Sequence, residues 1–320
     1  MNKPLPTKEE IKLIFETPLL DLIYKAAEVH RQNHNSTEIQ VCTLQSIKTG
    51  GCSEDCGYCA QSVHSEAQIE RTKLMDLEAV MVLAKEAKEN GSTRFCMGSS
   101  GRQVRDDADF ANILQMVKGV AGQGLEVCCT LGMLNQPQAE QLKEAGLYAY
   151  NHNLDTSREH YEKVTTTRKF DDRLETIDNL AKAGVSLCCG GILGIGETEA
   201  DRMSFLQSLT ELDPPPESVP INVLVPIAGT KMQSNERVPT LDLVRVIAAA
   251  RVLLPTSMIR LSAGRESLSP SDQAFCFLAG ANSIFSGDKL LTTPGPDADQ
   301  DASLFAGLNL TPQKPYSREK

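Results

Sequence analysis

The sequence predicts an α/β protein built as a (β/α)8 barrel of the TIM type. Two observations lead to this fold. Eight short apolar runs of strand length recur along the 320 residues, and longer segments that suit helices separate most of them. Strands that alternate with helices form a parallel sheet, and eight of them in one domain favour a closed barrel. A doubly wound open sheet is the alternative.

Each expected element can be placed on the chain. Several helix candidates are followed by Gly, as at Gly91, Gly124 and Gly184, which suits the position just beyond a helix C-terminus. The expected strands are Ile39–Ile47, Thr93–Gly98, Leu125–Leu131, Leu147–His152, Val185–Leu193, Val219–Val225, Ser257–Ser262 and Asn282–Phe285. The expected helices include Leu77–Glu89, Ala108–Ala121, Pro137–Ala145, Phe170–Ala183 and Leu241–Leu253.

The barrel is expected to occupy residues 37–294. Residues 1–36 precede the first strand and are expected to form an N-terminal helical extension, a lid or plug ahead of the barrel. Residues 295–320 begin with a stretch rich in Pro and Asp and are expected to form a loosely packed C-terminal tail.

Composition limits the partners and the location. The chain is 41% hydrophobic and carries a formal net charge of −10. Nucleic acids and anionic membranes attract basic surfaces, so neither is an expected partner. The first residues lack the apolar core of a signal peptide, and no stretch approaches 18 uninterrupted apolar residues. We therefore expect a cytoplasmic protein without membrane association.

Ten cysteines in such a protein need an explanation. In a reducing compartment, thiols bind metals, take part in catalysis or pack as small apolar groups. Cys52, Cys56 and Cys59 form a CxxxCxxC motif directly after the first expected strand, where active-site loops of barrels lie. Three thiolates can hold a 4Fe–4S cluster and leave one iron open. That iron can chelate the amino and carboxylate groups of S-adenosylmethionine.

The alternative for this motif is a structural zinc site with His64 as a fourth ligand. The spacing resembles the signature of the radical S-adenosylmethionine superfamily, which includes an aromatic residue just before the last cysteine. Tyr58 stands at that position here. The resemblance implies that Tyr58 lies near the adenine of the cofactor.

Side-chain alternation along the expected strands places three more cysteines and an arginine inside the barrel. Apolar side chains mark the outward face of each strand, because that face meets the helices. The residues that then point inward are Cys96, Cys128, Cys188 and Arg260. A strand cysteine is usually a small buried apolar residue, which we expect for Cys129, Cys189 and Cys276. An unpaired Arg in the interior needs an anionic partner, and a thiolate-bound 2Fe–2S cluster would be one.

Longer stretches of the chain resemble the biotin synthase family over nearly its whole length. The matching stretches are SIKTGGCSEDCGYCAQS, GSTRFCMG, YNHNLDTS, GGILGIGET, PPESVPIN, IRLSAGRE and AGANSIF. The resemblance implies a radical S-adenosylmethionine barrel that inserts sulfur between two unactivated carbons of dethiobiotin, giving biotin. A 5′-deoxyadenosyl radical would abstract hydrogen from the substrate, and a 2Fe–2S cluster would be the sulfur donor.

The resemblance also assigns ligands and contacts. It implies that Cys52, Cys56 and Cys59 bind the 4Fe–4S cluster. The implied ligands of the 2Fe–2S cluster are Cys96, Cys128, Cys188 and Arg260. The implied contacts with S-adenosylmethionine are Tyr58, Asn153, Asp155, Arg173 (as a fork on the methionine carboxylate) and Ile192 in a Gly-rich stretch. The implied contacts with the substrate are Asn151, Asn153 and Asn222, whose amides suit a cyclic urea.

One residue departs from the family pattern. Cys42 lies on the inward face of the first expected strand, where the resemblance leads us to expect a hydroxyl residue. It competes with Arg260 as the fourth ligand of the second cluster, and Arg260 is the preferred prediction.

Two classes of alternative function remain open. One is another radical enzyme on the same barrel, such as a hydrogenase-maturation or methylornithine synthase relative, and the other is a non-enzymatic zinc or iron–sulfur protein. The expected partners are dethiobiotin, S-adenosylmethionine, a second copy of the chain in a homodimer, and an electron donor such as flavodoxin or ferredoxin.

Overall fold

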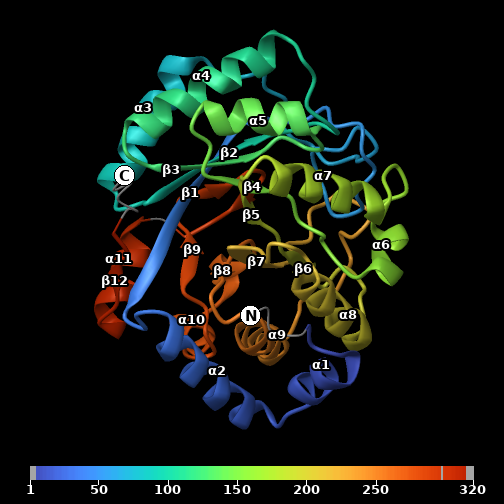
Figure 1. The fold of residues 1–320 in the computed structure, drawn as a ribbon, viewed down its shortest axis with the longest axis vertical. Coiled ribbons are helices and arrows are strands. Elements are labelled where there is room, and N and C mark those ends of the chain that lie inside the picture. Colours follow the sequence, from blue (N-terminus) through green and yellow to red (C-terminus); the bar gives the residue numbers. More distant parts are fainter. Residues whose placement is uncertain (1–4, 297, 315–320) are drawn as a thin grey trace.

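The computed structural model describes residues 5–296 and 298–314, and a closed parallel barrel forms its centre (Figure 1). β1 pairs with β2 on one side and with β9 on the other, so the ring closes and the expected barrel is confirmed. The ring contains β1 (Glu38–Lys48), β2 (Arg94–Ser99), β3 (Glu126–Thr130), β4 (Ala149–Asn151), β5 (Ser186–Cys188), β6 (Gly191–Leu193), β7 (Ser218–Val223), β8 (Met258–Leu261) and β9 (Ser283–Phe285).

The single strand expected over Val185–Leu193 is wrong, because the structure divides it into β5 and β6. Both strands pair with β7 and together fill one place in the ring. The break falls at Gly190, where an added Cβ would lie 1.9 Å from the carbonyl oxygen of Pro220. Only glycine allows the two backbones to approach this closely.

Helices cover the outside of the ring (Figure 1). The five helices named from the sequence are present with ends shifted by one residue at most, and α6, α8 and α10 are further helices whose bounds were not predicted. Thr198 begins α8 with a capping box, in which its side chain accepts from the Asp201 N–H and Asp201 bonds back. The helices are α3 (Leu77–Glu89), α4 (Ala108–Gly122), α5 (Gln136–Glu144), α6 (Arg158–Val164), α7 (Phe170–Lys182), α8 (Glu199–Thr210), α9 (Thr240–Leu253) and α10 (Pro270–Leu278).

Two separate groups of buried side chains follow the expected inward and outward sorting. The larger group lies between the strands and the helices and includes Phe95 and Val127, as well as the three cysteines expected only to pack, Cys129, Cys189 and Cys276. The smaller group lies inside the ring and consists of Cys42, Cys96, Cys128 and Ala149. Side-chain alternation along the strands therefore directs some cysteines outward, where they pack against the helices, and others into the barrel interior.

The N-terminal helices form an additional outer layer rather than a lid or plug. α1 (Lys8–Phe15) contacts α8 and α9, and α2 (Leu19–Asn33) packs along α9 (Figure 1). Phe15 and Leu22 are buried in the same core as the barrel helices. The expectation of a lid was wrong because this apolar face matches the outside of α9. Residues 1–4 of the expected extension lie outside the described residues.

The C-terminal stretch is also more ordered than the sequence led us to expect. It contains α11 (Ala298–Leu308), preceded by the small hairpin β10 (Lys289–Leu290) and β11 (Thr293–Pro294). Asp301 on α11 is buried and accepts two hydrogen bonds from the guanidinium of Arg265. β12 (Thr311–Pro312) then pairs with the start of β1. This buried ion pair explains why the segment packs; residues 297 and 315–320 lie outside the described residues.

Within the described residues, every helix is too short or too polar to cross a lipid bilayer.

His30 on α2 is a buried titratable group at the base of this outer layer. Burial, followed by the nearby charge of Arg251, lowers the pKa of His30 to about 3. Arg251 is itself fully buried and is held by the carbonyl oxygens of Gly280 and Ser257. The histidine is therefore neutral in the folded protein over the whole physiological range.

We predict that His30→Gln weakens the pH dependence of the free energy of unfolding. In the unfolded chain His30 titrates near the ordinary histidine pKa of 6.5, whereas in the folded protein its pKa is about 3. Between these values only the unfolded state binds the proton, so stability present above pH 6.5 is lost as the pH falls. Between neutral pH and about pH 5 this amounts to about 2 kcal/mol. Urea unfolding of both proteins at these two pH values measures it.

The control is His64→Gln, which changes an exposed histidine. It should keep the pH dependence of the parent protein. Equal pH dependence in the parent and in His30→Gln would contradict the account of His30.

Candidate active site

The three-cysteine loop leaves the carboxyl end of β1 directly. Gly50 and Gly51 both have positive φ angles, of 80° and 74°, which favour glycine where the chain turns out of the strand. The Cys52 N–H then donates to the carbonyl oxygen of Gln61 over 3.0 Å, which closes the loop on itself. The motif is thereby presented as one compact turn at the mouth of the barrel.

The thiols of this loop lie close enough to affect one another. Burial raises the pKa of the Cys59 thiol to about 12, and the neighbouring Cys56 and Cys52 add to the effect. Arg168 Nη2 lies 3.9 Å from Cys56 Sγ. Metal ligation requires thiolates, so a bound cationic centre would replace the protons that these buried thiols otherwise keep.

A ready single-ion site is not part of this arrangement. Among the described residues, no group of three or more His, Cys, Asp or Glu side chains is placed to bind one metal ion. In a 4Fe–4S cluster each thiolate binds a different iron, so wider thiol spacing is appropriate.

Asp55, inside the motif, anchors the loop to the segment after α6. Its carboxylate accepts hydrogen bonds from the Thr166 N–H at 2.8 Å, the Thr165 hydroxyl at 2.7 Å and the Thr166 hydroxyl at 2.6 Å. Although burial acts in the opposite direction, the hydrogen bonds from Thr166 and Thr165 hold the pKa of Asp55 well below its usual range. The loop is thus fixed by a charged acceptor that stays ionised.

A cavity of about 290 Å³ adjoins the cysteine loop at the mouth of the barrel. The loop, β4, β6 and β7 all contribute to its wall. The lining includes all seven residues predicted for S-adenosylmethionine and substrate: Tyr58, Asn151, Asn153, Asp155, Arg173, Ile192 and Asn222. The structure thus gathers these residues from separate segments of the chain into one mostly apolar cavity with several polar groups in its wall, as is typical of ligand sites.

Asp155 organises one side of this cavity. It has a positive φ of 67°, an uncommon conformation for a residue other than glycine that often marks functional sites. Its carboxylate accepts from the Tyr58 hydroxyl over 3.0 Å and from Arg173 Nη2. Arg173 also donates to the Tyr161 hydroxyl. In this structure Arg173 therefore holds Asp155 rather than presenting a free fork to a carboxylate.

Asn151 connects the cavity with the barrel interior. Its Nδ2 lies 3.3 Å from Cys188 Sγ and 3.0 Å from Asn153 Oδ1, and its Oδ1 accepts from Thr130. Asn153 in turn accepts from the Gly190 N–H. A ligand in contact with Asn151 would thus lie one side chain away from an interior thiol.

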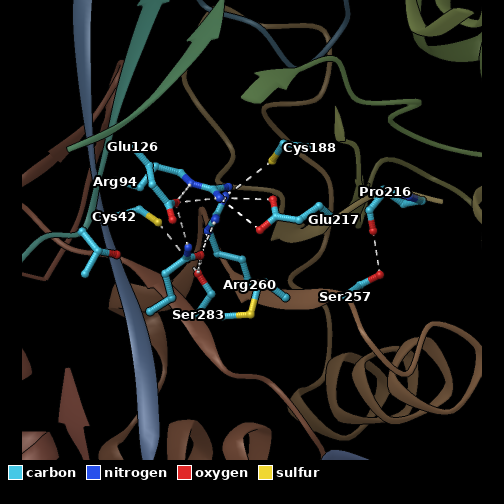
Figure 2. A network of polar contacts seen from close by, with 12 residues as sticks. Cys42, Arg94, Glu126, Cys188, Pro216, Glu217, Ser257, Arg260 and Ser283 are labelled. Atoms are coloured by element: carbon cyan, nitrogen blue, oxygen red, sulfur yellow. Dashed lines mark hydrogen bonds and ion pairs between the residues drawn. The ribbon is translucent and has the colours of Figure 1, made fainter. Parts of the chain in front are cut away.

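Cys42, Cys188 and Arg260 lie together in the barrel interior (Figure 2). Arg260 is fully buried on β8, and its Nη1 lies 3.5 Å from Cys188 Sγ. Its other nitrogens donate to Ser283 Oγ at 2.8 Å and Gln40 Oε1 at 3.0 Å. Among the described residues no carboxylate forms an ion pair with it. Although burial disfavours its charge, the thiols of Cys42 and Cys188 hold the pKa of Arg260 above its ordinary value.

The four predicted ligands of the second cluster therefore face one interior space. Cys96 and Cys128 are directly opposite each other on β2 and β3. The Cys128 thiol contacts Cys188, and this contact together with burial raises the pKa of Cys188 well above its ordinary value. A buried cation surrounded by thiols is the donor set that an anionic iron–sulfur cluster fits.

Arg94, the other interior arginine, has a different environment. It donates to Glu126 at 2.8 Å and to Glu217 at 3.1 Å, as Figure 2 shows. Its charge is therefore balanced by carboxylates, whereas that of Arg260 is not.

Sequence reasoning missed parts of the site that come from distant segments. The hairpin β10–β11 brings Leu291, Thr292 and Thr293 over the cavity, and Arg168 reaches the cysteine loop from the segment before α7. Gly287 and Pro294 mark the hairpin in the sequence as a turn-rich stretch, but nothing there indicates what it covers.

Fold and site together define a class of protein. A parallel barrel whose first strand leads into a three-cysteine loop beside a cavity is typical of a radical S-adenosylmethionine enzyme, and residues 46–209 match the Radical SAM superfamily. Residues 220–311 match the Biotin and Thiamin Synthesis associated domain. A 4Fe–4S cluster and S-adenosylmethionine are the cofactors that this class implies.

Curated relatives narrow the assignment. Biotin synthase of Cytophaga hutchinsonii is 56% identical over 310 residues, covering 97% of this chain and 92% of its own length. Biotin synthase of Gloeobacter violaceus is 54% identical over 311 residues, covering 97% and 98% respectively. The chain belongs to the biotin synthase family.

Solved structures show the same fold at low identity. Methylornithine synthase superposes with a TM-score of 0.80 at 16% identity, over 98% of this chain and 95% of that one. The FeFe-hydrogenase maturase HydG of Carboxydothermus hydrogenoformans gives 0.81 at 16% identity, over 96% and 76%. These two proteins belong to the classes considered as alternative functions from the sequence. At 16% identity, their similarity to this chain shows only that they share the barrel fold.

We predict that Asp55→Ala lowers the free energy of unfolding by about 2–3 kcal/mol, because a buried ionised acceptor and its threonine partners lose their hydrogen bonds. The same change should reduce the iron retained by the cysteine loop after gel filtration. Chemical denaturation and iron analysis measure the two effects.

Asp171→Ala is the matched control. Asp171 forms an exposed ion pair with Arg158 at 2.7 Å, so its loss should cost less than about 1 kcal/mol and leave the iron content unchanged. Equal effects of the two substitutions would contradict the role given to Asp55.

Proposed function

We propose that this protein converts dethiobiotin to biotin by inserting sulfur between two unactivated carbons, with S-adenosylmethionine as the radical source and a 2Fe–2S cluster as the sulfur donor. The observation that carries the proposal is the single cavity that has the cysteine loop at its wall and the interior thiols one side chain below it. Membership in the biotin synthase family supports the substrate and the product.

The residues proposed to bind S-adenosylmethionine have different roles. When bound, S-adenosylmethionine on the 4Fe–4S cluster supplies a 5′-deoxyadenosyl radical, and the 2Fe–2S cluster supplies sulfur. Tyr58 and Asp155 line the part of the cavity next to the cysteine loop, where they would contact the nucleoside. Arg173 keeps Asp155 oriented through its direct ion pair. Ile192 forms part of the same wall from β6.

The residues proposed to contact the substrate line the same cavity. Asn222 on β7 is held by the Gly191 carbonyl oxygen and the Ala263 N–H, which fixes the orientation of its amide. Asn151 and Asn153 present further amide groups to the same space. A cyclic urea offers both donors and acceptors, so three fixed amides are suitable partners for it. Thr292 and Thr293 add hydroxyls at the cavity entrance.

Cys96, Cys128, Cys188 and Arg260 would hold the second cluster. Their support is the interior thiol group and the buried charge of Arg260, which lacks a carboxylate partner among the described residues. A bound anionic cluster would balance that charge. Because Asn151 touches Cys188, the sulfur donor would be next to the substrate.

The proposal includes two partners of the enzyme as a whole. A homodimer and an electron donor such as flavodoxin or ferredoxin are inferred from the family resemblance. Reduction by a small redox protein suits a cysteine loop that lies at the barrel mouth, with Cys52 and Cys59 partly exposed.

We predict that the triple variant Cys96→Ala, Cys128→Ala, Cys188→Ala retains about four irons per chain and loses the 2Fe–2S component of the Mössbauer spectrum. The parent protein, reconstituted without oxygen, should hold about six irons. The variant should still release 5′-deoxyadenosine and methionine from S-adenosylmethionine but form no biotin, because only the sulfur donor is removed.

The outward triple variant Cys129→Ala, Cys189→Ala, Cys276→Ala removes the same number of thiols from the helix-facing core. It should keep both cluster signals. Four irons in the parent and no 2Fe–2S signal would replace this proposal with a related radical enzyme. One bound zinc and no cluster would overturn it entirely.

A further inference from the structure

Cys42 is an interior thiol for which the proposed function has no use. All ten cysteines lie within the described residues, and of the four outside the two proposed ligand sets Cys42 alone lies in the interior group with Cys96 and Cys128. Its side chain is fully buried on β1. Cys129, by contrast, packs outward against the helices.

Cys42 and Arg260 approach the same point from opposite sides. Cys42 Sγ lies 3.9 Å from Ser283 Oγ, which accepts a 2.8 Å hydrogen bond from Arg260 Nε (Figure 2). The contact with Ser283 is long, even for sulfur, so the thiol is held only weakly. A group bound by Arg260 would therefore also be within reach of Cys42.

The guanidinium of Arg94 provides a second reason to expect an anionic ligand beside Cys42. Arg94 is its neighbour in register on β2 and is fully buried. Arg94 Nε and Nη2 are bound by Glu126 and Glu217, but Nη1 has no hydrogen-bond partner among the described residues. A buried guanidinium N–H without a partner is costly, and an anionic ligand in the interior would satisfy it.

We propose that Cys42 is an exchangeable ligand of the second cluster, able to bind the iron that Arg260 would otherwise hold. This inference rests on the proposed function, because it assumes a 2Fe–2S cluster between Cys96, Cys128 and Cys188. The exchange involves no electron transfer: one iron–nitrogen bond is replaced by one iron–sulfur bond, and the proton lost by the Cys42 thiol is taken up by the guanidine of Arg260 as that side chain leaves the iron. The freed Arg260 then stands beside the new thiolate as its counter-charge.

The exchange would keep the irons inside the barrel when Arg260 is displaced. A thiolate is a softer and more strongly bound ligand for iron than a guanidine nitrogen. With three thiolates and Arg260 as ligands, the iron bound to Arg260 is held weakly. With Cys42 in place of Arg260, all four ligands of the cluster are thiolates. Cys42 would act when the weak ligand is absent.

The test compares the cluster content of four anaerobically reconstituted proteins by Mössbauer spectroscopy and visible absorption, without any activity assay. These are the parent, Cys42→Ser, Arg260→Met, and the double variant Arg260→Met/Cys42→Ser. The parent and each single variant should show the 2Fe–2S signal, with at least about half of the parent's signal in Arg260→Met. The double variant should show at least about a fivefold smaller signal than Arg260→Met.

Control variants distinguish failure of this inference from misfolding of a variant and from failure of the proposed function. Arg260→Met/Cys129→Ser should behave as Arg260→Met, since Cys129 faces the helices. If Arg260→Met does not fold, as judged by its 4Fe–4S content, Arg260→Lys takes its place. An equal 2Fe–2S signal with and without Cys42, or its loss from Arg260→Met while Cys42 is present, would overturn the inference. Absence of the signal from the parent would instead overturn the proposed function.

Discussion

The structure depends on one constraint: a positive charge, that of Arg260, is enclosed in a closed barrel without a carboxylate partner among the described residues. Burial of an unpaired charge is strongly unfavourable unless something compensates it. The other interior arginine, Arg94, satisfies this need with Glu126 and Glu217. Around Arg260 the available groups are thiols and neutral amides and hydroxyls. An anionic thiolate-bound cluster would balance this charge, which is the physical reason for proposing the sulfur donor at this place.

The closed ring also determines how the cysteine loop and the interior thiols are placed relative to each other. The cysteine loop is anchored by hydrogen bonds from the threonines after α6 to Asp55 within the loop, and the interior thiols are positioned by strand register. Asn151, at the end of β4, is where the two meet, because it lines the cavity and touches Cys188. In the proposed function, the radical source at the mouth and the sulfur source in the interior would leave the substrate between them. The barrel would then fix the relative positions of all three reactants.

The parts predicted from the sequence are those that depend on local periodicity. Alternation along a strand was enough to direct Cys128 inward and Cys129 outward, because apolar residues must face the helices. Contacts between distant segments left no such signal: the Asp55 anchor and the Arg265–Asp301 pair join parts of the chain that nothing in the sequence connects. The break at Gly190 was missed for the same reason, since its cause is the backbone of a different strand.

The most direct test of the central claim is an isotope experiment on the sulfur. The enzyme would be reconstituted with 34S-sulfide, freed of excess sulfide, and given dethiobiotin, S-adenosylmethionine and a reducing system in the presence of unlabelled cysteine and sulfide, with Mössbauer spectra taken in parallel. The account predicts biotin that carries 34S, and a 2Fe–2S signal that falls in step with biotin while the 4Fe–4S signal persists. Biotin with unlabelled sulfur, or an unchanged 2Fe–2S signal during turnover, would contradict the claim that the interior thiols and Arg260 hold the sulfur donor.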